Sequence, residues 1–117
     1  MKISYRGIGQ MCATFACGDT MAEGKPVKVS ADSTAAVCAA GDAFCGVCAA
    51  VGRAGDACSV QLRGFVTVPY TGTAAPAVGY SRLAANGTGG IKTGAETDRA
   101  YLVVQVDTTA KTATIML

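Results

Sequence analysis

The stretches AGDAFCGV (40–47) and AGDACSVQ (54–61) repeat one short pattern, fourteen residues apart. In each copy a Gly-Asp pair precedes residues of alternating character. Glycine adopts the positive φ of a tight turn, aspartate caps the neighbouring backbone, and a period of two is typical of a strand. The pattern therefore predicts a turn followed by a strand, twice. It assigns the role of turn anchor to Gly41, Asp42, Gly55 and Asp56.

The strongest strand pattern runs from residue 58 to residue 70. Its alternate residues form one expected face, which consists of Val60, Leu62, Gly64, Val66 and Val68. Pro69 lacks the N–H that a central strand requires, so the strand is expected to end there.

Two hairpins are expected in the second half of the chain. Asn86 and Gly87 open the stretch NGTGG, a strong hairpin signal, and both are further turn anchors. Residues 101–106 and 112–117 alternate on either side of a polar turn and predict a C-terminal hairpin. Many short strands at this spacing favour an all-β fold, a small single-domain β-barrel or β-tulip.

Residues 1–15 are expected to form an extended N-terminal arm, and residues 16–117 the β-barrel domain. In the arm Ile3 and Tyr5 alternate with polar neighbours, and Gly7 and Gly9 then interrupt the pattern. Glycine within a strand pattern is typical of bulges or close backbone approach. Such an arm can complete its own sheet or add a strand to a neighbour's.

The charge and composition of the chain give no support to nucleic-acid binding, membrane insertion or secretion. Charged residues make up 15% of the 117-residue chain, against about 25% in typical soluble domains. The net charge of +2 and the absence of a basic cluster give no indication of nucleic-acid binding. The longest apolar run, residues 43–51, is too short for a membrane span. The sequence does not open with an apolar stretch of signal-peptide length, so we expect a protein that is made and kept in a cytosol or released by lysis.

Six cysteines are the main candidates for chemistry: Cys12, Cys17, Cys38, Cys45, Cys48 and Cys58. Cys45 and Cys48 form the one CxxC pair, and it lies within a strand pattern, where residues three apart point to opposite faces. Buried, unpaired thiols are therefore favoured over a redox pair or a metal site. A bulge at Gly46, or convergence of distant thiols, keeps a metal site open.

Catalysis is not expected. The chain has no histidine, the commonest general base. Its eight carboxylates lie almost all beside Gly, Ser or Thr at expected turns, where they cap the backbone. We expect no catalytic residue, no cofactor and no metal. Tyr70 and Tyr80 are either contact residues or lids on the core at strand ends.

Six segments of the sequence resemble one family of small proteins: GKPVKVS (24–30), GDAFCGV (41–47), QLRGFV (61–66), LAANG (83–87), YLVV (101–104) and VDTT (106–109). With these segments the chain resembles the capsid-decoration, or cement, proteins of tailed-phage and prophage head modules. The six cysteines are not part of that family pattern, so a thiol-based role stays open.

The resemblance implies a small β-barrel or β-tulip on the outer surface of an icosahedral head, often a trimer at three-fold axes. The partners implied are the major capsid protein and further copies of the chain, with neither nucleic acid nor a membrane involved. In that family an N-terminal arm engages the capsid protein. The residues of this arm that would contact it are Ile3, Tyr5, Arg6, Ile8 and Met11.

Two other functions compete with decoration of the capsid. One is another virion role, such as a tail-tube or head-joining subunit, which ring formation in solution would favour. The other is a cysteine-based metal or redox module, which six free thiols without metal would exclude. The low charge and turn-and-strand pattern favour a scaffold that acts through its surfaces.

Overall fold

The computed structural model describes residues 4, 8–17, 21–52, 56–72 and 74–117. These residues form ten strands: β1 (Met11–Cys17), β2 (Pro26–Ala31), β3 (Thr34–Val37), β4 (Gly46–Val51), β5 (Ala57–Arg63), β6 (Phe65–Pro69), β7 (Gly79–Ala85), β8 (Ile91–Thr93), β9 (Ala100–Asp107) and β10 (Thr112–Met116). The all-β expectation is confirmed. The described residues contain no helix with the length and hydrophobicity to cross a bilayer.

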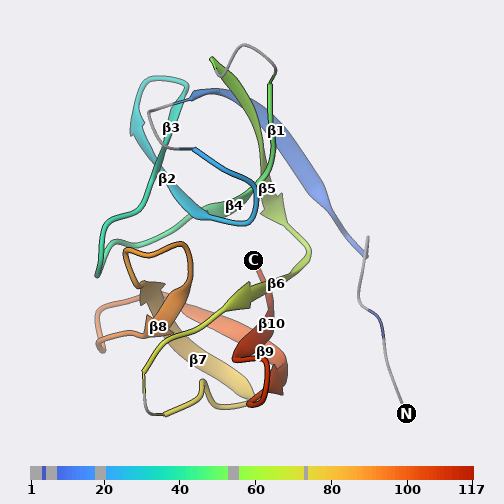
Figure 1. The fold of residues 1–117 in the computed structure, drawn as a ribbon, viewed down its shortest axis with the longest axis vertical. Coiled ribbons are helices and arrows are strands. Elements are labelled where there is room, and N and C mark those ends of the chain that lie inside the picture. Colours follow the sequence, from blue (N-terminus) through green and yellow to red (C-terminus); the bar gives the residue numbers. More distant parts are fainter. Residues whose placement is uncertain (1–3, 5–7, 18–20, 53–55, 73) are drawn as a thin grey trace.

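The first five strands form a closed barrel in the order β1-β3-β2-β4-β5 (Figure 1). The β1–β3 pair is parallel, and the other neighbours are antiparallel. Small and β-branched side chains fill its interior, which suits a narrow barrel. The buried residues of this core are Val27, Ala35, Cys48, Cys58 and Val60.

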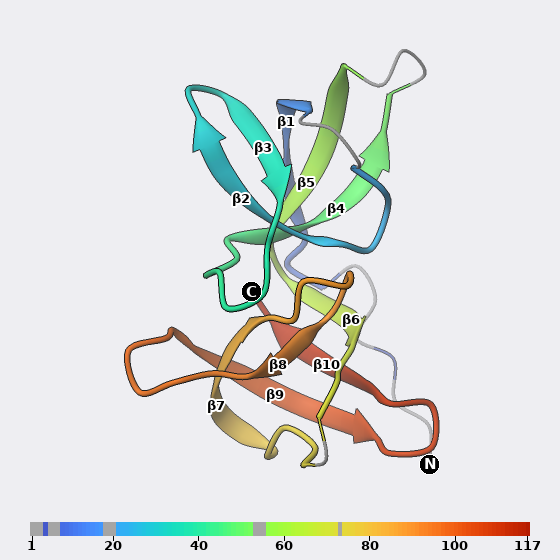
Figure 2. The same cartoon turned by 60° about the vertical axis from the view of Figure 1, so that its left-hand side comes forward.

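The last five strands form a second, antiparallel sheet in the order β6-β10-β9-β7-β8. A parallel bridge between Tyr70 and Ile91 connects the two ends of this sheet, which therefore curls around its own core. The sheet lies beneath the barrel along the long axis (Figure 2). Both expected hairpins are present, since β7 pairs with β8 and β9 with β10.

The predicted strand from residue 58 to residue 70 is in fact two strands that belong to different sheets. Gly64 separates β5 of the barrel from β6 of the second sheet, and its φ is +100°. A positive φ of this size breaks the regular strand, which is why the apolar alternation does not continue on a single face. The Gly64 carbonyl accepts the Leu117 N–H at 2.9 Å, which holds the C-terminus at the junction.

The loop between β3 and β4 joins the barrel to the second sheet. Its Phe44 side chain is buried in the core of the second sheet and stacks on Tyr101, with ring centroids 4.6 Å apart. The Tyr101 hydroxyl donates to the Phe44 carbonyl at 2.6 Å. The Gly41 N–H also donates to the Ala85 carbonyl at 2.9 Å. The two sheets are therefore held together by the buried Phe44 side chain, which we call the plug, and by backbone hydrogen bonds.

Part of the expected N-terminal arm is a strand of the barrel. Residues 11–15 lie in β1, which pairs with β5 from Met11 opposite Arg63 to Ala16 opposite Ala57. This pairing uses the edge of residues 11–15 that faces β5, and within the described residues β1 pairs with β3 at Ala16 and Cys17. The stretch is therefore anchored in the barrel through its pairing with β5. Residues 8–10 precede the strand, and Ile3, Tyr5 and Arg6 lie outside the described residues.

The expected turn anchors can be located at five of the six positions. Gly41 has a φ of +87°, and the Asp42 carboxylate accepts the Ala39 N–H at 2.9 Å and the Lys28 ammonium at 2.6 Å. The Asp56 carbonyl accepts the N–H of Cys17. In the β7–β8 turn the Asn86 carboxamide accepts the N–H groups of residues 88 and 90, and Gly87 has a φ of +82°. Gly55 lies outside the described residues.

Candidate functional site

Four large apolar side chains form a row across the outer face of the second sheet. The strand registers place Phe65 opposite Met116, Met116 opposite Leu102, and Leu102 opposite Tyr80. The row therefore crosses β6, β10, β9 and β7 without interruption. We call these four residues the apolar row.

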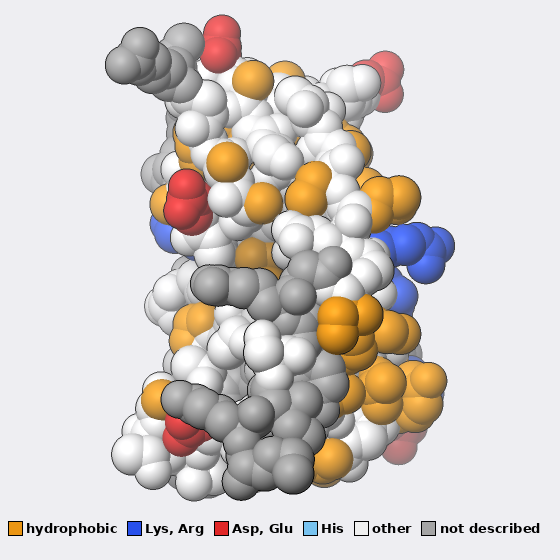
Figure 3. All heavy atoms as spheres, turned by 90° about the vertical axis from the view of Figure 1, so that its right-hand side faces the viewer, with side chains coloured by type: hydrophobic (Ala, Val, Ile, Leu, Met, Phe, Trp, Pro, Cys, Tyr) orange, Lys and Arg blue, Asp and Glu red, His pale blue; other side chains and the backbone are white. Residues whose placement is uncertain are grey.

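The apolar row points away from the protein core. The residues next to it in sequence, Ile115 and Val103, are buried in the core of the second sheet, and alternate residues of a strand face opposite sides. Tyr80 is 76% exposed and Met116 is 40% exposed. Figure 3 shows hydrophobic side chains gathered along one side of the lower half of the molecule. Phe65 and Leu102 are partly buried. A contiguous apolar patch that is exposed in part is typical of a protein interaction site.

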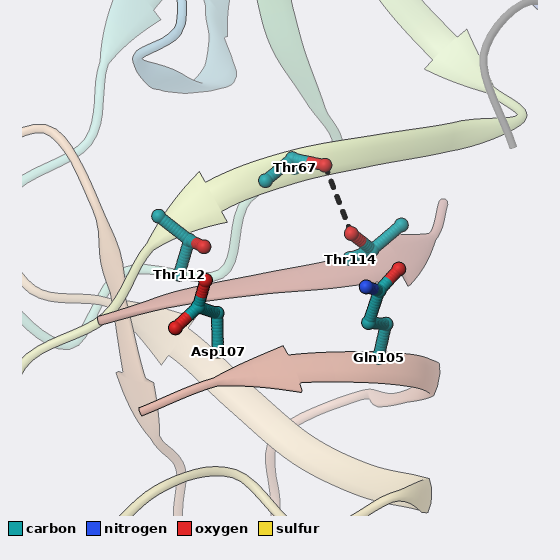
Figure 4. Close-up of a pocket in the computed structure, with 5 residues that line it drawn as sticks. All are labelled: Thr67, Gln105, Asp107, Thr112 and Thr114. Carbon is teal, nitrogen blue, oxygen red and sulfur yellow. Dashed lines mark hydrogen bonds between the residues drawn. The ribbon is translucent and has the colours of Figure 1, made fainter. Parts of the chain in front are cut away.

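A polar pocket of about 170 Å³ adjoins the apolar row on the same face. Its lining consists entirely of side chains that are capable of hydrogen bonding: Thr67, Gln105, Asp107, Thr112 and Thr114 (Figure 4). The Thr67 and Thr114 hydroxyls are 2.9 Å apart and hydrogen-bond to each other. The pocket spans β6, β10 and the end of β9, so its geometry is set by paired strands.

A β-bulge brings the pocket residues of β9 to the outer face. Thr114 pairs with Gln105 whereas Ile115 pairs with Val103, so one extra residue of β9 is accommodated at this point. Leu102 and Gln105 therefore both face outward although they are three residues apart. This irregularity explains why the apolar row and the polar pocket share one face.

The Asp107 carboxylate is held in place by its own turn. Its Oδ1 atom accepts the N–H groups of Thr109 at 2.9 Å and Ala110 at 3.0 Å. Among the described residues the structure contains one ion pair, between Lys28 and Asp42. Asp107 therefore forms no ion pair with a described residue. The second carboxylate oxygen of Asp107 thus has no protein partner in the described part of the chain and is available to a ligand.

Two of the expected arm residues are exposed, and one of them lies close to this face. Ile8 is 54% exposed and Met11 is 48% exposed. The Ile8 carbonyl oxygen lies 3.0 Å from the position that a Cβ on Gly64 would occupy. Gly64 is the residue directly before Phe65 in the sequence. Ile8 therefore lies beside the end of the second sheet where the apolar row begins.

The two tyrosines that the sequence analysis singled out have different environments. Tyr70 is buried in the core of the second sheet, where it acts as a lid at the end of β6. Tyr80 is the most exposed member of the apolar row. Sequence reasoning missed the other three members, because their alignment depends on the pairing of β6, β10 and β9. The consecutive apolar residues 101–104 of β9 place apolar side chains on both faces of the strand. That pattern is the signal from which Leu102 could have been identified.

The cysteines are all free thiols. Cys48 lies in β4 with its side chain in the barrel core, whereas Cys45 precedes β4, so the expectation that both lie inside one strand is wrong for Cys45. The Cys45 thiol donates to the Val27 carbonyl, and the Cys48 thiol donates to the Ala50 carbonyl. Among the described residues, no three His, Cys, Asp or Glu side chains are grouped in a way that could hold a metal ion.

Burial predicts a strong contrast in thiol reactivity. It raises the pKa of Cys38 to about 11 and that of Cys58 to about 12, and the adjacent Cys17 thiol adds to the second shift. Since the thiolate is the nucleophile, iodoacetamide at pH 8 is expected to label exposed Cys12 within minutes and to leave these two unmodified in the folded protein. Mass spectrometry of the digested protein measures this. Rapid labelling of Cys58 without denaturant would contradict the buried position.

Neither a scan against protein-family models nor a search of curated proteins found a match. Function is therefore inferred from the surface itself. The face described above combines apolar side chains with a hydrogen-bonding pocket on a rigid sheet. This arrangement suits the binding of another macromolecule through shape and polarity.

Proposed function

We propose that the chain is a structural virion protein that decorates and stabilises the outer surface of an icosahedral phage head by binding the major capsid protein. It would be made in the cytoplasm of a bacterial host and assemble on the capsid as a homotrimer. The observation that carries this proposal is the apolar row on the second sheet, in which Tyr80 and Met116 are exposed. The sequence resemblance to capsid-decoration proteins supports the choice of partner.

The apolar row has the composition of an interface centre. Tyr, Phe and Met are enriched at protein interfaces, and their burial removes apolar surface from water at about 25 cal/mol per Å². A sheet presents such residues on paired strands, so little conformational entropy is lost when a partner covers them. A partner that binds only the folded chain also stabilises it by mass action. Both effects suit a protein that cements a shell.

Several of the segments that carry the resemblance lie where the two sheets are connected. Residues 41–47 span the end of the loop that joins the barrel to the second sheet and the start of β4, and residues 83–87 lead into the β7–β8 turn. Residues 61–66 cross the Gly64 junction. Three of the six segments also carry residues of the candidate face: residues 61–66 include Phe65, residues 101–104 include Leu102, and residues 106–109 include Asp107. The resemblance therefore extends to the surface through which we propose that the chain binds.

Binding to heads that lack this protein provides the test. The variant Tyr80→Ser/Met116→Gln removes exposed apolar surface without disturbing the core and is expected to bind such heads at least about 100-fold more weakly, because interface anchors each contribute about 2 kcal/mol or more. Val29→Ser is the matched control, since Val29 is 53% exposed on the barrel strand β2. Its binding should equal that of the unmodified protein.

The same particles test the cement role. Heads that carry the unmodified protein should resist heat and osmotic shock better than bare heads, and heads mixed with the double variant should behave as bare heads. If bare and decorated heads break at the same temperature, the stabilising role is wrong. Equal binding by the double variant and the control would remove the apolar row from the interface.

A further inference from the structure

The polar pocket and the apolar row form one continuous binding face. Pairing of β6, β10 and β9 places Thr67, Thr114 and Gln105 in the row of residues next to the apolar row. Thr112 and Asp107 pair in the row beyond. Successive outward rows are two residues apart, about 7 Å along the strands. A partner that covers the apolar row thus reaches the pocket with its neighbouring side chains.

The pocket is rich in hydrogen-bond acceptors and carries one negative charge. Asp107 is the one ionisable residue in its lining, and one of its carboxylate oxygens is unpaired within the described residues. The three threonine hydroxyls and the Gln105 carboxamide can also accept hydrogen bonds. Ammonium and guanidinium groups donate several hydrogen bonds and accept none, so they complement this lining. A phosphate or carboxylate would be repelled by Asp107.

We infer that the partner places a basic side chain, lysine or arginine, in the polar pocket while its apolar side chains cover the apolar row. This inference rests on the proposed function and specifies the chemistry of the capsid surface that the face binds. The turn N–H groups of Thr109 and Ala110 hold the Asp107 carboxylate fixed before binding. A fixed charge two rows, or about 14 Å, from the apolar row sets the register in which the partner docks.

The variant Asp107→Asn tests the charge and leaves the turn intact, because a carboxamide oxygen can still accept the N–H groups of Thr109 and Ala110. We expect about tenfold weaker binding to undecorated heads, with a smaller dependence on salt concentration, and recovery of most of the affinity in Asp107→Glu. Asp98→Asn is the matched control. Asp98 accepts the Ala95 N–H with its carboxylate in the turn at the opposite end of β9, outside the pocket.

Acetylation of the heads identifies the basic group. If acetylated heads lose affinity for the unmodified protein but not for Asp107→Asn, the group is a lysine; if only Asp107→Asn weakens binding, it is an arginine. Equal affinity and salt dependence of the unmodified protein and Asp107→Asn would overturn the inference while leaving the proposed function in place. If the unmodified protein does not bind heads at all, the proposed function and this inference both fail.

Discussion

Replacement of Phe44 by alanine is expected to lower the free energy of unfolding by about 3–5 kcal/mol, the range for truncation of a buried aromatic side chain. Phe44 belongs to the loop between β3 and β4, yet its ring fills the core of the second sheet. The change would leave a cavity in this core and remove the stacking on Tyr101, whose ring centroid is 4.6 Å away. Urea denaturation followed by far-UV circular dichroism measures the loss.

Tyr101→Phe separates the ring contact from the hydrogen bond. It keeps the aromatic stacking and removes the hydroxyl that donates to the Phe44 carbonyl, so a smaller loss of about 1–2 kcal/mol is expected. A biphasic transition in Phe44→Ala would show that the barrel and the second sheet unfold separately once the plug is lost. A loss below about 1 kcal/mol would mean that the loop does not hold the two sheets together.

This junction also bears on the proposed interface. The apolar row and the polar pocket lie on the outer face of the sheet whose inner face packs on Phe44. A sheet supported from inside presents its outer side chains with few alternative arrangements, and such preorganisation favours affinity. Loss of the plug should therefore weaken binding to the partner even though Phe44 does not lie on the binding face.

Local signals in the sequence were enough for the hairpins. The Asn86-Gly87 pair supplies both the side-chain acceptor and the positive φ of its turn, so the β7–β8 connection follows from two adjacent residues. The β9–β10 hairpin follows in the same way from alternation on both sides of Asp107. Barrel closure, in contrast, depends on the parallel pairing of β1 with β3, which no local pattern encodes.

The candidate face could not be predicted, because it depends on relations between strands. Within β6, Phe65 shares its face with Thr67, whereas Val66 and Val68 face the core, so the strand alone gives Phe65 a mixed face. Only the register with Met116 and Leu102 brings it into an apolar row. The bulge between Thr114 and Ile115 then decides which residues of β9 line the pocket. Register and bulges follow from packing of the whole sheet, which a single strand does not reveal.

Gly64→Ala is expected to destabilise the fold by about 2–5 kcal/mol for two reasons that add. A side chain at positive φ costs about 1–2 kcal/mol, and overpacking against fixed atoms costs about 1–3 kcal/mol more. Gly64 has a φ of +100°, and a Cβ there would lie 2.9 Å from the Gln10 Cα and 3.0 Å from the Ile8 carbonyl oxygen. Both contacts are with backbone, so neither can be relieved by a side-chain rotation.

Gly79→Ala isolates the conformational part of this cost. Gly79 has a φ of +99°, close to that of Gly64, but a Cβ there meets nothing within 4 Å. It should therefore lose only about 1–2 kcal/mol. A larger loss in Gly64→Ala than in Gly79→Ala, measured by urea denaturation, would show that the chain before β1 packs against the junction between the sheets. Equal losses would mean that residues 8–10 move aside freely. In that case Ile8 would belong to a displaceable segment and could still reach a capsid partner.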